Sequence, residues 1–300
     1  MPTIEENVKC WNGEYDWTQQ GEEWSLPWGG SEAQWWGSLL PRIHAFVPCG
    51  SILEIAPGYG RWTRFLKDLC ERLTVIDLSA GCIEHCRRRF ASSNHITYFT
   101  NDGKSLDMIA DQSVDFVFSF DSLVHAEADV LEAYLRQLAR KLTPNGVGFI
   151  HHSNAARYGF YLSLLKMKRP VTEGQPAGGA PNGAHSPVRE SLRRGKRFLI
   201  ERGLLINDCA RALSMSAGLF EEYCNRAGLR CIGQEIINWS GSAVIDCIST
   251  FTHQGSHWER PNQVVENRQF VQESRNIARV SNLYSQSAVP RAPSGSATRR

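Results

Sequence analysis

The feature that most constrains this chain is an alternation of short apolar segments with helix-forming segments between Ser51 and Asn154. Strands that alternate with helices pair in parallel, and the helices then cover both faces of the sheet. The expected strands are Ser51–Ile55, Leu73–Asp77, His95–Phe99, Val114–Phe118 and Val147–Ile150. The expected helices are Arg61–Leu73, Ala80–Phe90 and Asp129–Leu142. We therefore expect an α/β fold whose ligands bind at the carboxyl ends of the strands.

This alternation divides the chain into three parts. Residues 1–48 form an N-terminal cap that is rich in tryptophan, and residues 49–254 form the central domain. Two more strands are expected in that domain, at Arg230–Ile237 and Ala243–Phe251, after an insertion at residues 155–212. Residues 255–300 form a C-terminal extension, of which about the last 15 are polar and expected to be disordered.

Composition and charge exclude several classes of protein. Hydrophobic residues make up 42% and charged residues 21%, as in an ordinary globular protein. The net charge of +2 disfavours a dedicated nucleic-acid binder, which is usually far more basic. No apolar run reaches the roughly 18 residues of a membrane helix, and no signal peptide is visible. The nine cysteines form no disulfide framework, so we expect a reduced, cytoplasmic protein.

A glycine-rich turn, Glu54-Ile-Ala-Pro-Gly58-Tyr-Gly60, follows the first strand. Its glycines let the backbone approach a ligand closely, and its N–H groups can meet an anionic group. Thr63 stands where the dinucleotide fingerprint needs glycine, and the Gly-Lys-Ser/Thr ending of a phosphate-binding loop is absent. The turn therefore suits a carboxylate and a ribose, and Glu54 suits an ammonium group. A plain strand-to-helix turn is the alternative.

Acidic side chains also follow the next two strands. Asp77 lies 23 residues after Glu54, where an acid accepts hydrogen bonds from both ribose hydroxyls. Alternatively, Asp77 only helps to start the helix at Ser79. Asp102 and Gly103 follow the third strand, and Asp102 can accept a hydrogen bond from an adenine amino group. An ordinary turn explains these two residues equally well.

These three motifs, in this order, resemble the class I S-adenosylmethionine (SAM)-dependent methyltransferase family. Ala56 replaces the first glycine of the family's loop, and Pro57 follows it. The resemblance implies a Rossmann-like, seven-stranded sheet whose last strand is antiparallel, with SAM as the cofactor. We expect no metal at the site, although the wider family includes metal-dependent O-methyltransferases. The side chains and backbone expected to bind SAM are those of Glu54, Gly58, Gly60, Asp77, Leu78, Asp102, Gly103, Ser119 and Trp28.

Imidazoles and a carboxylate follow the fourth and fifth strands. In the family, the segment with Asp121 and His125 lies beside the sulfonium, and the segment with His151 and His152 faces the methyl acceptor. A hydroxyl acceptor needs a base as the new bond forms, and histidine suits this near neutral pH. These four residues are therefore the candidate catalytic set, although successive strand residues point in opposite directions. A divalent ion held by Asp121, His151 and Asn154 is a weaker alternative.

The methyl acceptor is indicated only indirectly. The motif of amino-methylating DNA enzymes and the Pro-Cys nucleophile of pyrimidine methylation are both absent, which leaves an oxygen acceptor. The cap residues Trp24, Trp28, Trp35 and Trp36 can stack on SAM or a sugar ring, or can simply form a core. Residues Arg157–Arg211 carry eleven basic and four acidic side chains, which favours a phosphate-bearing acceptor or a solvated face.

We therefore predict SAM-dependent O-methylation of a small-molecule or glycan acceptor. RNA methylation is the alternative within the fold, with the basic insertion contacting phosphates. A catalytically silent SAM-fold binding protein is the alternative from another class. The sequence carries no signal for the oligomeric state.

Overall fold

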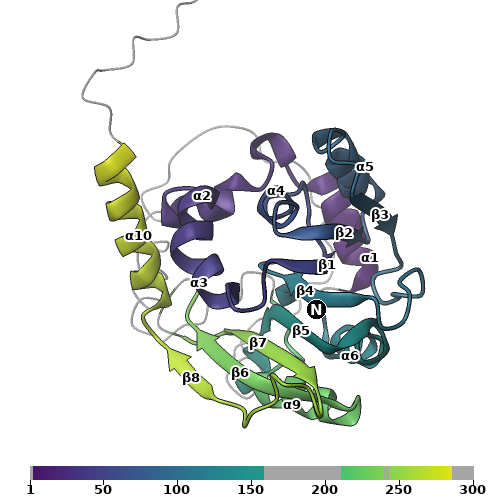
Figure 1. The fold of residues 1–300 in the computed structure, drawn as a ribbon. Helices are drawn as coiled ribbons and strands as arrows, with labels where there is room; N and C mark the ends of the chain where they lie inside the picture. The colour runs from purple at the N-terminus through teal and green to yellow at the C-terminus, as the bar shows by residue number, and fades with distance from the viewer. Residues whose placement is uncertain (1–2, 159–210, 240, 242, 286–300) are drawn as a thin grey trace, which may run out of the picture.

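The computed structural model describes residues 3–158, 211–239, 241 and 243–285 (Figure 1). Most of the insertion expected at 155–212, and the tail expected to be disordered, lie outside the described residues. Among the described residues, no helix is both long and apolar enough to cross a lipid bilayer.

The described residues form one sheet of eight strands in the order β3-β2-β1-β4-β5-β7-β6-β8. The strands are β1 (Cys49–Ile55), β2 (Cys70–Asp77), β3 (Ile96–Thr100), β4 (Val114–Ser119), β5 (Leu142–Ser153), β6 (Leu229–Ile237), β7 (Asp246–His253) and β8 (Val264–Asn267). Strands β1 to β5 are parallel, and β7 runs antiparallel to both β5 and β6. The Rossmann-like fold with an antiparallel β7 is therefore confirmed. An eighth strand, β8, extends the expected seven by pairing in parallel with β6.

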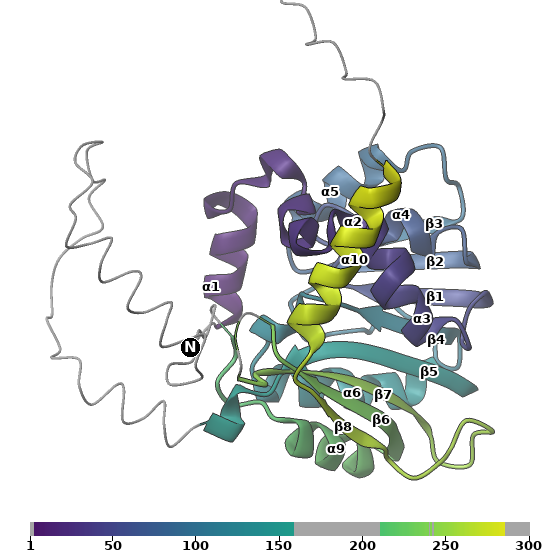
Figure 2. The same cartoon turned by 90° about the vertical axis from the view of Figure 1, so that its left-hand side faces the viewer.

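Helices cover both faces of the sheet (Figure 2). They are α1 (Ile4–Lys9), α2 (Ser31–Gln34), α3 (Leu40–Ile43), α4 (Thr63–Leu66), α5 (Ala80–Arg89), α6 (Ala128–Lys141), α9 (Ala217–Arg226) and α10 (Phe270–Ser285). Short 3₁₀ or π segments join them, namely η1 (Cys10–Glu14), η2 (Trp17–Gln19), η3 (Glu22–Trp28), η4 (Trp35–Leu39), η5 (Leu123–His125) and η6 (Ala155–Tyr158).

The alternation of side chains along the strands separates two cores. Phe116 and Phe118 of β4 pack in the core that contains the cap, α4, α5 and α10. Val117, between them, packs in the core that contains α6 and α9. Successive strand residues point to opposite faces, so the apolar run Phe116–Phe118 of this central strand serves both cores.

Two element boundaries differ most from those expected. The helix expected at Arg61–Leu73 is only one turn, α4, because the chain from Cys70 onward pairs with β1 as strand β2. Strand β5 begins at Leu142, five residues before the expected start at Val147, because Leu142 already pairs with Val114. In both places, pairing with a neighbouring strand overrides the local helix or turn preference.

The C-terminal extension packs on the N-terminal cap. Helix α10 lies beside α2 and η3 (Figure 2), and a Cβ added at Gly37 would lie 2.9 Å from Ile277 of α10. The Arg42 guanidinium contacts Glu235 of β6 at 2.7 Å and Glu273 of α10 at 2.8 Å. These contacts fix the cap above the carboxyl ends of the strands, where the pocket described next is found.

Candidate active site

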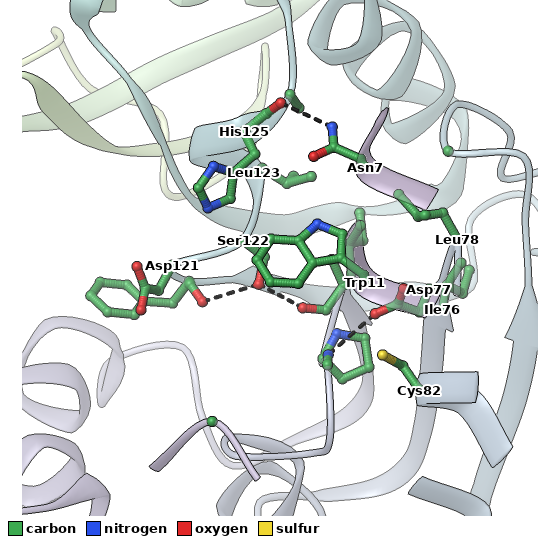
Figure 3. A pocket seen from close by; sticks show the side chains of 18 of the residues that line it. Asn7, Trp11, Ile76, Asp77, Leu78, Cys82, Asp121, Ser122, Leu123 and His125 are labelled. Carbon is green, nitrogen blue, oxygen red and sulfur yellow. Dashed lines mark hydrogen bonds between the residues drawn. The ribbon is translucent and has the colours of Figure 1, made fainter. Parts of the chain in front are cut away.

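A pocket of about 940 Å³, counting its open mouth, lies at the carboxyl ends of the central strands. Its walls come from the cap, from the glycine-rich turn with the end of β2, and from the segment between β4 and α6. In the view of Figure 3, Asp77, Leu78 and Cys82 stand on one side, Asp121 and His125 stand on the other, and Trp11 lies between. In this sheet the strand order reverses between β1 and β4. Open α/β sheets bind ligands at the carboxyl ends of the strands beside such a reversal.

The glycine-rich turn has left-handed backbone at Ala56, Gly58 and Gly60, with φ of +58°, +58° and +83°. Ala56 therefore keeps the conformation of the glycine it replaces, at a cost of about 1 kcal/mol. Gly58 lines the pocket, and a Cβ there would lie 2.9 Å from the Trp17 ring. Gly60 does not line the pocket. A Cβ at Gly60 would lie 2.6 Å from Phe90, so this glycine is required for packing.

Asp77 is placed as expected, at the pocket wall and next to Leu78. Its carboxylate accepts hydrogen bonds from the backbone N–H of Ser79 at 2.8 Å and of Gly58 at 3.2 Å. Burial raises the pKa of Asp77 to about 6, although these N–H groups oppose the shift. The same carboxylate thus joins the turn to the start of α5 and faces the pocket.

Glu54 and Ser119 lie behind the pocket wall, which corrects the expectation that they contact the ligand directly. Glu54 is buried and accepts a hydrogen bond from the Thr63 hydroxyl at 2.5 Å. Burial raises the pKa of Glu54 to about 8, so its carboxyl is neutral at pH 7. Among the described residues, neither Glu54 Oε1 nor Ser119 Oγ has a hydrogen-bond partner.

Only one residue of the predicted adenine turn reaches the pocket. Gly103, with φ of +84°, lines it, and Ile4 of α1 lies 3.3 Å from the position of an added Cβ. The Asp102 carboxylate instead accepts the backbone N–H groups of Lys104 at 2.9 Å and Ser105 at 2.7 Å, which lower the pKa of Asp102. The ordinary-turn interpretation therefore describes Asp102, and the adenine contact expected of it is not formed by this geometry.

Trp28, which was expected to contact the cofactor, does not line the pocket. Trp28 is buried and packs against Trp239 and Phe270, with ring centroids 5.4 and 5.7 Å away. Of the other tryptophans expected over the site, Trp35 is buried on Phe65 and Trp36 is exposed.

The aromatic rings that do line the pocket include Trp11, Trp17 and Trp24. Trp17 stacks on Tyr59 of the glycine-rich turn, with centroids 4.3 Å apart. Trp24 was expected near the ligand, whereas Trp11 and Trp17 were not selected, because irregular cap segments have no periodicity that marks an inner face. The cap thus contributes rings to the pocket from the segment before residue 25.

Asp121 lines the pocket on the side opposite Asp77. Its backbone is left-handed, with φ of +65°, and its carboxylate pairs with the Arg61 guanidinium at 2.8 Å. Arg61 also donates to Ser25 Oγ at 3.0 Å and lies over the rings of Trp24 and Trp62. Sequence reasoning missed Arg61, although its position directly after Gly60 placed it beside the site.

The three candidate histidines lie in different environments. His125 lines the pocket, with its ring centroid 5.6 Å from that of Trp11. His151 is fully buried behind the wall, where its Nδ1 accepts the backbone N–H of Asp121 at 3.1 Å.

His152 is not a pocket base, which corrects its inclusion in the catalytic set. Its ring is buried against Phe220 of α9, with Nε2 2.8 Å from Ser249 Oγ and Nδ1 2.8 Å from the Ser153 carbonyl. Burial lowers the pKa of His152 to about 3. The reason is the strand geometry: adjacent residues of β5 point to opposite faces.

The weaker metal hypothesis finds no support in this geometry. Asn154 donates to the Val244 carbonyl at 3.0 Å and accepts the Ala217 N–H at 2.9 Å, so its amide is already used. Within the described part of the chain, no group of three His, Cys, Asp or Glu side chains is arranged to hold a metal ion.

Comparison with known proteins gives a family for the central segment. Residues 52–146 match the family model described as a methyltransferase domain. Nodulation protein S of Bradyrhizobium diazoefficiens is 31% identical over 131 residues, which are 41% of this chain and 59% of the relative. Nodulation protein S of Rhizobium tropici is 27% identical over 143 residues, which are 46% of this chain and 59% of the relative. The chain thus spans less than two thirds of these relatives.

Two of the solved structures with a similar backbone fold align with most of this chain and with most of their own chain. The PH0226 protein of Pyrococcus horikoshii OT3 is 17% identical, with a TM-score of 0.49, 74% of this chain covered and 91% of that chain. The DhpI–SAH complex is 19% identical, with a TM-score of 0.48, 87% of this chain covered and 98% of that chain.

Proposed function

We propose that this chain, which belongs to the class I SAM-dependent methyltransferase family, transfers a methyl group from SAM to an oxygen of a small-molecule or glycan acceptor. The proposal rests on one observation: the residues expected to bind the cofactor and those expected to face the acceptor line two sides of the same pocket. Gly58, Asp77 and Gly103 line one half, and Asp121 and His125 line the other.

The residues of the first half suit SAM. The buried Asp77 carboxylate suits the two ribose hydroxyls, and Leu78 with Gly103 offers an apolar frame for the adenine. The backbone of the turn at Gly58 lines the pocket, where it can approach the methionine part. SAM, when bound, supplies an electrophilic methyl group.

The second half suits a neutral, hydroxyl-bearing acceptor. The rings of Trp11, Trp24 and Trp62 line it, and aromatic rings pack well on the C–H faces of a sugar. Arg61, the one arginine among the described lining residues, is already paired with Asp121. A phosphate-bearing acceptor would therefore depend on the basic residues between 157 and 211, most of which lie outside the described residues.

In this proposal the protein acts by holding the acceptor and removing its proton. The cap excludes water and positions the acceptor, which is the larger part of the catalysis. His125 takes the hydroxyl proton as the methyl group is transferred. Asp121, oriented by Arg61, accepts a hydrogen bond from the acceptor.

The cytoplasmic location also remains a proposal. Eight cysteines of the described residues carry free thiols, which supports a reducing compartment.

The test is a turnover screen that measures S-adenosylhomocysteine release over neutral sugars, nucleotide sugars, glycans and RNA, with hydroxyl and amino versions of each sugar. His125→Ala should lower kcat by roughly 100-fold or more while the Kd for SAM stays unchanged. His257→Ala, at an exposed position, is the matched control. No thermal stabilisation by SAM or its demethylated product would refute the enzyme proposal. Turnover on RNA alone, or on amino sugars alone, would refute the proposed acceptor.

A further inference from the structure

A chain of buried polar contacts runs behind the acceptor side of the pocket. It begins at Arg211 and passes through Asp246 and His151 to Asp121. The side chains of the first three are between 0% and 4% exposed. Buried polar groups lower stability unless they are satisfied, so such a chain in the core calls for a role beyond packing.

The first link joins two charges. The Arg211 guanidinium makes two hydrogen bonds to the Asp246 carboxylate, at 3.0 and 2.8 Å. Burial raises the pKa of this carboxyl, but the charge of Arg211 and the contact with His151 outweigh it, and the resulting pKa of Asp246 is about 2. Asp246 therefore stays ionised, and its Oδ2 lies 3.4 Å from Nε2 of its second neighbour, His151, an electrostatic contact without hydrogen-bond geometry.

The second link fixes the orientation of an imidazole. His151 Nδ1 accepts the backbone N–H of Asp121 at 3.1 Å, so Nδ1 carries the lone pair. The ring proton then lies on Nε2, which is 3.4 Å from Asp246 Oδ2. The tautomer is assigned from these bonds. The rings of Phe120 and Trp239, with centroids 4.7 and 5.1 Å away, hold the imidazole from its sides.

The third link reaches a strained residue of the pocket. Asp121 has φ of +65°, a conformation that costs a side-chain-bearing residue of the order of 1–3 kcal/mol and persists only when its surroundings enforce it. The N–H that His151 accepts belongs to this same residue. The Asp121 carboxylate then pairs with Arg61, which donates to Ser25 in the cap.

We propose that His151, oriented by Asp246 and Arg211, is a positioning residue that holds the backbone of Asp121 and so aims the Asp121–Arg61 pair at the methyl acceptor. His151 does not line the pocket and exchanges no proton with the acceptor. This inference rests on the proposed function, because the acceptor is the group whose placement depends on Asp121. The cofactor half of the pocket is independent of it.

Two substitutions of His151 separate positioning from packing. In His151→Asn, the side-chain oxygen takes the place of Nδ1 and can still accept the Asp121 N–H. In His151→Phe, an aromatic ring of similar size fills the space but accepts nothing. Three quantities are measured for each variant: the Kd of SAM by calorimetry, the kcat and KM for the best acceptor found in the screen, and the hydrogen-exchange rate of the Asp121 amide by NMR.

The expected result is a split between the two variants. Loss of the buried acceptor in His151→Phe should lower kcat/KM for the acceptor by roughly 10- to 100-fold and speed exchange of the Asp121 amide by a similar factor. His151→Asn should recover most of both. The Kd for SAM should stay within about threefold in both variants, because the cofactor half does not contact His151.

Other outcomes overturn the inference. Equal acceptor turnover in wild type and His151→Phe would show that His151 only fills space. An equal loss in both variants would show that turnover does not depend on the hydrogen bond from the Asp121 N–H. A loss of SAM affinity that matches the loss of turnover would show general damage to the pocket. If no acceptor is turned over even by the wild type, the proposed function fails. The exchange rate of Asp121 then still decides whether His151 holds this backbone.

Discussion

The burial of Glu54 leads to a quantitative prediction about stability and pH. Its carboxyl is 1% exposed, with one hydrogen bond from Thr63. Burial raises its pKa from 4.5 to about 8. The folded protein therefore keeps a proton on Glu54 that the unfolded chain has lost at neutral pH. Stability from this proton is fully present below the unfolded pKa and is lost as the pH rises through the folded one.

The perturbation is Glu54→Gln, which keeps the shape of the side chain and removes its titration. Between pH 6 and pH 9, a folded pKa of about 8 and an unfolded pKa of 4.5 lower the wild-type unfolding free energy by roughly 2 to 3 kcal/mol through this group. The Glu54→Gln variant lacks this contribution to the pH dependence of the unfolding free energy. The difference in unfolding free energy between variant and wild type should therefore shift in favour of the variant by that amount.

The assay is urea unfolding of both proteins at several values between pH 6 and pH 9. Comparing the two proteins cancels the titration of the groups that do not interact with Glu54. Glu71→Gln, at an exposed position on the same strand β2, controls for the removal of one carboxyl group. If the difference between Glu54→Gln and wild type changes by less than about 0.5 kcal/mol over this range, Glu54 is not held neutral and the reasoning is wrong.

Three further predictions concern the pocket and its frame. Asp77→Ala should weaken SAM binding in calorimetry by roughly 10- to 100-fold. Because the pKa of Asp77 is raised to about 6, the affinity of the wild type for SAM should also decrease at pH values below 6, where the carboxylate becomes protonated. Unchanged affinity in Asp77→Ala, or in the wild type at low pH, would contradict the role of Asp77. Gly60→Ala should lower the unfolding free energy by about 2 kcal/mol, since its φ is +83° and its Cβ meets Phe90; a variant as stable as wild type would contradict this. Trp28→Ala should lower stability by roughly 3 to 5 kcal/mol in denaturant unfolding, while the folded fraction keeps its Kd for SAM; a weaker Kd would restore Trp28 as a cofactor contact.

The order of elements and part of the pocket lining, namely Gly58, Asp77, Leu78 and Gly103, could be predicted from the sequence. Apolar runs of strand length, separated by helix-forming segments, require a parallel sheet because no other arrangement buries both faces of such strands. Gly58 and Asp77 could be selected because Gly58 lies in the turn after β1 and Asp77 is the last residue of β2, and adjacent parallel strands bring their ends together. The same local reasoning placed Gly103 and Leu78 at the pocket.

What only the tertiary structure decided depends on which way side chains point and what packs against them. Asp121, His125 and His151 follow strands equally well in the sequence, yet one forms an ion pair, one lines the pocket and one is buried behind the wall. Trp28 and Trp17 are the same residue type in the same cap. Trp28 is buried against Phe270 of α10, whereas Trp17 lines the pocket. Strand order and strand ends are set by short-range patterns. The roles of single side chains are set by contacts between distant segments, such as Arg42 with Glu235 and with Glu273, which are 193 and 231 residues apart, and no local pattern encodes these.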